Sequence, residues 1–483
     1  MSNYLGTGRM HEGRRIAKNT IALFTAQIVV ALLTIVLTIF IARYLGDVIF
    51  GKYSFAIAFT AFFVIFSKLG YETLLVREVA KDRSSAKEYM NNILGIRLIL
   101  SLIIFVFIII TINLMNYPND TKLVVYLFGF YYILESLSEI YKVAFRAFQI
   151  MEYEAITKII ANIIRVSLSI IVLFLGYGLI EIALIFILSG IFDIIFSIIV
   201  CNKKVVKSKP SISLKFFKET LRIVLPLSMI TIFSLIYVRA DTIMLSILKG
   251  DEVVGWYNAA YQLVLGFKPI PHLFMTALFP LMSFYYVSSK DSLKMMYEKS
   301  FKYLFILGLP LAVGITLVAD KIIIIFFEME FFNSIIALQI LSWDILFLFL
   351  SMCLSFVLVS MNKQTPMAIF AGFSALINVV INLLLIPSYS YVGAAVATIA
   401  SEAFLFIAWF ILVSKNLHIL PFTKIIIKPL IACGAMALIL YYFHSLNAML
   451  LISIAIATYF GLIYVLKGLS DEDMKILKDI VKR

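Results

Sequence analysis

Long runs of apolar residues, separated by short polar loops, fill the chain from Ile21 to Leu466. Runs such as Ile99–Ile112 lack the strict alternation of a membrane β-barrel strand. Because a helix crosses a bilayer core in about 20 residues, each run is long enough to span it. The pattern predicts an all-α integral membrane protein with fourteen spans, at 21–42, 48–67, 91–113, 122–143, 157–176, 179–201, 222–247, 254–282, 303–319, 333–359, 367–387, 391–413, 425–443 and 447–466.

Composition supports this class. Hydrophobic residues make up 63% of the chain and charged residues only 14%, whereas soluble domains are about a quarter charged. The first span is too long for a signal-peptide core and lacks a small-residue cleavage site, so we expect it to be retained. Cys201, Cys353 and Cys433 lie far apart without a CxxC motif, so neither a disulfide framework nor a metal site is expected.

The chain has a net charge of +13, and its basic residues lie in alternate loops. They form no single basic face, which argues against nucleic acid as a partner. Most Lys and Arg residues lie on the side that holds both termini. The other side has only Arg43, Lys122, Lys249 and Lys321. The distribution predicts a cytoplasmic-membrane protein with both termini in the cytoplasm and short outer loops.

An internal repeat links Gly46–Ala56 to Gly250–Ala260, where Gly, Asp, Gly, Tyr and Ala match without gaps. Six spans separate the copies, so the two halves should run in the same direction through the membrane. The predicted domains are an N-terminal six-helix lobe (1–201), a basic cytoplasmic connector (202–221), a C-terminal six-helix lobe (222–417), two additional transmembrane helices (418–467) and a cytoplasmic amphipathic tail (468–483).

The connector and the tail each place apolar residues among lysines, a pattern typical of helices lying on a membrane surface. In the connector these are Leu214, Phe216, Phe217 and Leu221. We interpret both segments as membrane anchors in preference to binding sites for anionic lipid regulators.

Ionisable residues inside the spans are numerous, and such groups normally face a polar cavity or a partner. Glu135 and Glu139 share one helical face and could pair with Arg97 or Arg165. The alternative to such pairing between helices is a wet cavity that receives an anionic substrate. The candidate cavity cations are Arg165, Arg239, Lys268 and Arg97, and the candidate coupling or ion-pair carboxylates are Asp241, Glu135, Glu139, Asp193 and Glu402.

The segment Gly266–His272 surrounds Lys268 with two prolines and a glycine, which predicts a break or kink in the eighth span. Asn378 and Asn382, four residues apart, are interpreted as interhelical hydrogen-bonding groups or cavity lining. No nucleotide-binding, nucleophile-elbow or zinc-protease motif occurs, so no enzymatic activity or cofactor is expected. Any energy source would be a Na⁺ or H⁺ gradient, the membrane potential or the substrate's own gradient.

Several motifs resemble a known family. They are Ala42-Arg43-Tyr44-Leu45-Gly46, Phe50-Gly51-Lys52-Tyr53, Arg77-Glu78-Val79-Ala80, Arg239-Ala240-Asp241-Thr242 and Val254-Gly255-Trp256-Tyr257-Asn258. With the helix count, they resemble polysaccharide-biosynthesis flippases of the Wzx type, in the multidrug/oligosaccharidyl-lipid/polysaccharide exporter superfamily.

The resemblance implies a MATE-like fold of two pseudo-symmetric six-helix lobes that alternate between inward and outward openings. It also implies transport of a polyprenyl-diphosphate-linked oligosaccharide to the outer leaflet, alongside other polysaccharide-assembly proteins. Related lipid II flippases carry cavity arginines that include the first helix, whereas this chain has no basic residue between Lys18 and Arg43. A glycolipid other than lipid II is therefore favoured.

Two other functions stay open. A cation-coupled drug exporter of the same fold would need a carboxylate such as Asp241, Asp193 or Glu402. A membrane glycosyltransferase or polymerase would depend on the outer-loop cluster of Asp320, Glu328 and Glu330.

Overall fold

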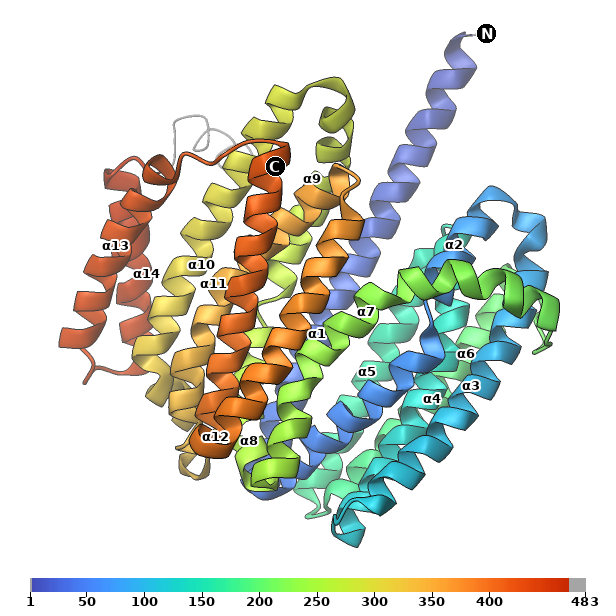
Figure 1. Cartoon of the computed structure of the whole chain (residues 1–483), viewed down its shortest axis with the longest axis horizontal. Helices are drawn as coiled ribbons and strands as arrows, with labels where there is room; N and C mark the ends of the chain where they lie inside the picture. Colours follow the sequence, from blue (N-terminus) through green and yellow to red (C-terminus); the bar gives the residue numbers. More distant parts are fainter. Residues whose placement is uncertain (1, 469–483) are drawn as a thin grey trace. The chain divides into compact units, whose positions relative to one another are not determined.

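The computed structural model describes residues 2–468, and every regular element in that range is a helix (Figure 1). The α-helices are α1 (Ser2–Lys68), α2 (Tyr71–Lys81), α3 (Ala86–Leu114), α4 (Asn119–Ala147), α5 (Met151–Phe174), α6 (Leu179–Lys204), α7 (Leu214–Lys249), α8 (Asp251–Leu265), α9 (Pro269–Ser288), α10 (Lys290–Phe327), α11 (Ser334–Ser360), α12 (Gln364–Asn416), α13 (Phe422–Tyr442) and α14 (Ala448–Val465). Short 3₁₀ turns cover Arg83–Ser85 and Met329–Phe331.

The described chain has 12 helical segments long and apolar enough to cross a membrane. Two of them, Ala22–Lys81 and Gln364–Asn416, each contain two of the fourteen predicted spans. Non-helical residues separate those spans, Gly46 with φ 76° in α1 and Ser390 with φ 53° in α12. Large apolar side chains such as Leu102 and Phe107 of α3 are exposed, as expected for surfaces that face lipid.

The predicted break in the eighth span is confirmed. Helix α8 ends at Leu265 and α9 begins at Pro269. Between them, the amides of Phe267 and Lys268 each donate to a carbonyl three residues earlier, a tight turn that leads into the proline.

The two copies of the sequence repeat share an unusual backbone conformation. Gly46 has φ 76° and ψ 175°, and Gly250 has φ 91° and ψ 179°. Positive φ is readily available only to glycine, which explains why both copies begin with this residue. Each glycine turns the chain into the next helical stretch, so the sequence repeat is also a structural repeat.

The chain divides into two compact units, one ending at Gly255 and the other beginning at Trp256. In the first unit, α1 packs against α4, α5 and α7, and α4 packs against α3, α5 and α6. In the second, α11 packs against α9, α10 and α12, and both α13 and α14 pack against α10. The first compact unit includes α7, which the prediction assigned to the second lobe. The division into lobes at 1–201 and 222–417 stays a prediction.

The connector leaves α6 after Lys204 and enters α7 at Leu214, where the Ser213 side chain accepts a hydrogen bond from the Phe216 amide at 3.3 Å. The helix predicted at Leu214–Leu221 is therefore the start of α7, continuous with the seventh span. The amphipathic tail from 469 onward lies outside the described residues.

Candidate functional site

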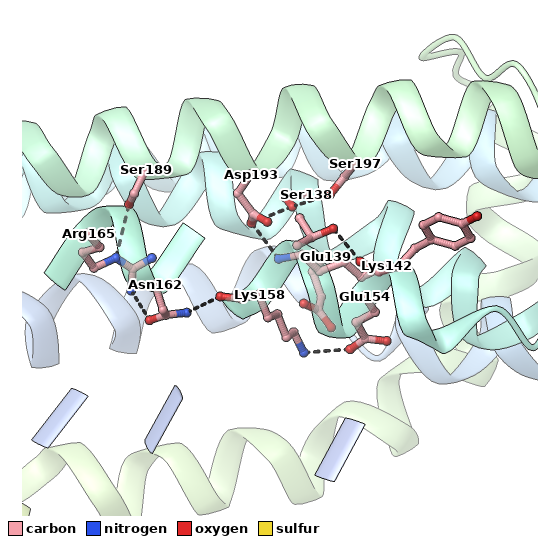
Figure 2. Close-up of polar contacts among 12 residues, drawn as sticks. Ser138, Glu139, Lys142, Glu154, Lys158, Asn162, Arg165, Ser189, Asp193 and Ser197 are labelled. Atoms are coloured by element: carbon pink, nitrogen blue, oxygen red, sulfur yellow. Dashed lines mark hydrogen bonds and ion pairs between the residues drawn. The ribbon is translucent and has the colours of Figure 1, made fainter. Parts of the chain in front are cut away.

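Several charged side chains inside the first unit form ion pairs, some of them with a neighbouring helix. Arg146 of α4 bonds Glu139 at 2.7 Å and Glu154 of α5 at 2.6 Å, and Lys158 bonds Glu154 at 2.7 Å. Figure 2 shows Glu139, Glu154 and Lys158 in this group. An ion-pair network was predicted, but its partners differ: Glu139 bonds Arg146, and neither Arg97 nor Arg165. Arg146 sits at the end of α4, outside the apolar run that guided the prediction.

Asp193 of α6 forms a second, deeply buried pair with Lys142 of α4, at 2.6 Å (Figure 2). Ser138 also donates to the same carboxylate oxygen at 2.8 Å. A carboxylate neutralised by a lysine at contact distance is a structural link between helices in this conformation.

Arg97 of α3 is 1% exposed and joins three neighbouring segments. It lies 3.4 Å from the Glu72 carboxylate of α2, and it donates to the backbone carbonyls of Ser136 at 3.1 Å and Lys68 at 3.3 Å. These contacts favour a structural role over contact with a substrate.

Arg165 of α5 has a different environment. Its guanidinium lies 4.9 Å from the ring centroid of Tyr131 and 4.8 Å from that of Phe186. Its Nε donates to Ser189 at 3.2 Å and its Nη1 to Asn162 at 3.4 Å (Figure 2). No described carboxylate lies within ion-pair distance of it, so its charge is oriented by rings and neutral polar groups.

Arg239 of α7 lies near two tyrosines, Tyr53 and Tyr132. The charges of Arg239 and Arg165 both act on the hydroxyl groups of Tyr53 and Tyr132. The Nε of Arg239 is buried and has no hydrogen-bond partner among the described residues. We call Tyr53, Tyr131, Tyr132, Arg165 and Arg239 the arginine–tyrosine cluster.

Aromatic packing supports this cluster. The Phe186 ring lies edge-on to Tyr131 at 5.3 Å and to Tyr53 at 6.2 Å between centroids. Glu135, one helical turn from Tyr131, also interacts electrostatically with Arg165. These tyrosines were not predicted from the sequence; the available signal was the Tyr131-Tyr132 pair one turn before the intramembrane carboxylate of Glu135.

The remaining candidates are distributed over both units. Asp241 of α7 is buried in the first unit, and Glu402 of α12 is buried in the second. Lys268 is exposed in the break between α8 and α9. Asn378 donates to Ser401 across the break in α12 at 3.4 Å, in agreement with the predicted hydrogen bonding between spans, and Asn382 donates to Asn378 within its own helical stretch at 3.1 Å.

Within the described residues, no group of three or more His, Cys, Asp or Glu side chains is arranged to hold a metal ion. The first unit instead contains two arginines whose charges act on the same tyrosine hydroxyl groups. Guanidinium groups favour phosphate because their planar N–H donors match its oxygens.

Comparison with known families identifies the chain. The family model described as "Polysaccharide biosynthesis protein" matches residues 16–285, more than half of the sequence. This chain belongs to the polysaccharide biosynthesis protein family. A second model, MatE, matches residues 226–384. These are flippase and transporter families and not enzyme families, in agreement with the prediction.

Curated relatives of this family member extend over most of its length. It is 23% identical to the capsular polysaccharide biosynthesis protein CapF of Staphylococcus aureus, over 82% of this chain and 98% of the relative. It is 25% identical to the uncharacterized membrane protein MJ1068 of Methanocaldococcus jannaschii, over 73% of this chain and 72% of the relative.

Solved structures show the fold of the family member. The lipid II flippase MurJ in an inward closed conformation matches with a TM-score of 0.75 and 17% identity, covering 92% of this chain and 98% of MurJ. An inward-facing MATE multidrug transporter matches with a TM-score of 0.63 and 16% identity, covering 82% and 98%. The predicted MATE-like, multi-pass membrane fold is confirmed.

Proposed function

We propose that this protein is a flippase that moves a polyprenyl-diphosphate-linked oligosaccharide across the cytoplasmic membrane for cell-surface polysaccharide synthesis. The proposal includes the predicted orientation, with both termini in the cytoplasm, and cooperation with other polysaccharide-assembly proteins. Family membership and the CapF relative support the substrate class.

The arginine–tyrosine cluster is the observation that carries the proposal for the site. Arg165 and Arg239 lack a carboxylate at ion-pair distance among the described residues, whereas Arg97, Lys142 and Arg146 each have one. Cations inside apolar spans without a carboxylate at ion-pair distance are costly, and a bound anion lowers that cost. A diphosphate is such an anion, and the tyrosine hydroxyl groups suit the adjoining sugar.

The lipid carrier is proposed to be linked to a glycan other than the lipid II head group. The first span, 21–42, has no basic residue. The likeness to MurJ, at 17% identity, supports the fold but does not identify the substrate. The substrate depends on the side chains that contact it.

A cation-coupled drug exporter is the second candidate, supported by the MATE-like fold. Of the carboxylates that it could use, Asp193 already pairs with Lys142. This pairing disfavours Asp193 as the coupling group in this conformation.

Deletion of the gene in its host, with complementation by variants, tests the proposal. We expect lipid-linked oligosaccharide to accumulate in the cytoplasmic leaflet, wild type to reverse the accumulation, and Arg165→Ala or Arg239→Ala to fail. Lys290→Ala, which removes a positive charge from an exposed position at the start of α10, serves as the control and should complement. A normal glycolipid distribution together with new drug sensitivity would favour the exporter.

A further inference from the structure

The segment from Lys203 to Arg222 carries an unusual density of exposed positive charge. It contains seven basic side chains and one acidic one, and all eight are exposed: Lys203, Lys204, Lys207, Lys209, Lys215, Lys218, Glu219 and Arg222. None of the seven cations forms an ion pair with a carboxylate in the described part of the chain. We call this segment the basic strap.

Exposed apolar side chains lie among these charges. Ile212 is 51% exposed, Leu214 is 73% exposed and Ile223, directly after the strap, is 41% exposed. One face of the same helix is buried: Phe216, Thr220 and Val224 recur every four residues and turn into the unit. Cations beside exposed leucine and isoleucine match the boundary between phospholipid head groups and acyl chains.

The strap backbone is fixed to α3, which distinguishes it from a free polybasic tail. The side-chain oxygen of Asn91 accepts from the Lys209 amide at 2.8 Å, and its backbone carbonyl accepts from the Ser211 amide at 3.0 Å. The Asn92 side chain accepts from the Ser213 amide at 2.9 Å.

Gly95 explains how the strap comes so close to α3. A Cβ at this position would lie 2.1 Å from the Ser211 carbonyl oxygen. Because the backbone is already ordered, a ligand of the lysines has less conformational entropy to remove on binding.

We propose that the basic strap binds the head groups of anionic phospholipids, selecting them over zwitterionic ones. The sequence alone favoured simple anchoring. The unpaired cations, the apolar side chains between them and the backbone bonds to Asn91 and Asn92 together make a preformed surface for a negatively charged leaflet. This inference does not depend on which substrate the protein transports.

The test uses the full-length protein in phosphatidylcholine nanodiscs into which phosphatidylglycerol is titrated, with hydrogen exchange of the strap amides as the readout. The test variant combines Lys207→Gln, Lys209→Gln and Lys215→Gln. The control variant combines Lys290→Gln, Lys415→Gln and Lys467→Gln, which removes the same charge from exposed sites elsewhere.

We expect phosphatidylglycerol to protect the strap in wild type and in the control variant. A surface lysine contributes about fivefold to association with an anionic membrane, so three independent lysines contribute about a hundredfold, and the apparent affinity of the strap variant for phosphatidylglycerol should fall by at least about tenfold. Equal protection in phosphatidylcholine alone, equal responses of the two variants, or equal protection by inorganic phosphate would each overturn the proposal. Thermal unfolding of both variants verifies that they are folded.

Discussion

Gly51 packs directly against the backbone of Asp251, since a Cβ on Gly51 would lie 1.7 Å from the Asp251 carbonyl oxygen. The reciprocal contact also exists: a Cβ on Gly255 would lie 2.2 Å from the Asp47 carbonyl oxygen. These are equivalent positions of the two repeats, exchanged as expected for a two-fold relationship. The invariance of glycine between the copies thus has a steric cause.

Replacing Gly51 by alanine should therefore destabilise the protein. The methyl group would collide with backbone, which cannot move aside as a side chain can, so we expect a loss of about 1–3 kcal/mol or more. Gly434→Ala is the matched control, because nothing lies within 4 Å of its Cβ position. Thermal unfolding in detergent should show a lower Tm for Gly51→Ala and an unchanged or higher one for the control.

Replacing only one partner of the Lys142–Asp193 pair should reduce stability more than replacing both. Lys142→Met alone leaves a buried carboxylate without its cation, and we expect a loss of about 3–5 kcal/mol. Adding Asp193→Leu should recover much of that stability. The measurement is thermal unfolding of both single variants and the double variant. A single variant that is stable but has lost gradient-driven transport would instead assign coupling to Asp193.

Arg165→Lys should weaken the binding of a lipid diphosphate although it keeps the charge. Lysine cannot reproduce the planar contacts with Tyr131 and Phe186, which are worth about 0.5–2 kcal/mol. Arg239 makes no such ring contact among the described residues, so Arg239→Lys should lose less affinity. Binding of a short-chain polyprenyl-diphosphate sugar to the purified variants measures both. Equal losses would show that ring stacking does not orient the site.

Tyr117, in the turn between α3 and α4, links that turn to α7 through the Ser246 hydroxyl at 2.8 Å. Burial raises the pKa of Tyr117 to about 12, so the phenol stays protonated at neutral pH. A double-mutant cycle of Tyr117→Phe and Ser246→Ala should give a coupling energy of about 1 kcal/mol, measured by thermal unfolding. Additive single effects would mean that the hydrogen bond contributes nothing to stability.

The membrane class, the spans, the repeat and the break before Pro269 could all be predicted from the sequence. Each depends on local properties: the length of an apolar run, the glycines that open both repeat copies, or a proline that cannot continue a helix. The family resemblance came from short motifs of the same local kind. For this reason the sequence also predicted which charges lie inside spans.

Only the tertiary structure decided which of those charges are paired. Arg97 meets Glu72 and Lys142 meets Asp193 because helices from different parts of the chain pack side by side. Spacing along one helix reports which residues share a face, but it does not report which neighbouring face lies opposite. The same packing brings the charges of Arg165 and Arg239 to the same tyrosines, so the candidate site depends on the tertiary structure. The sequence alone indicated that some such site exists, because charges inside apolar spans need a partner or a polar cavity.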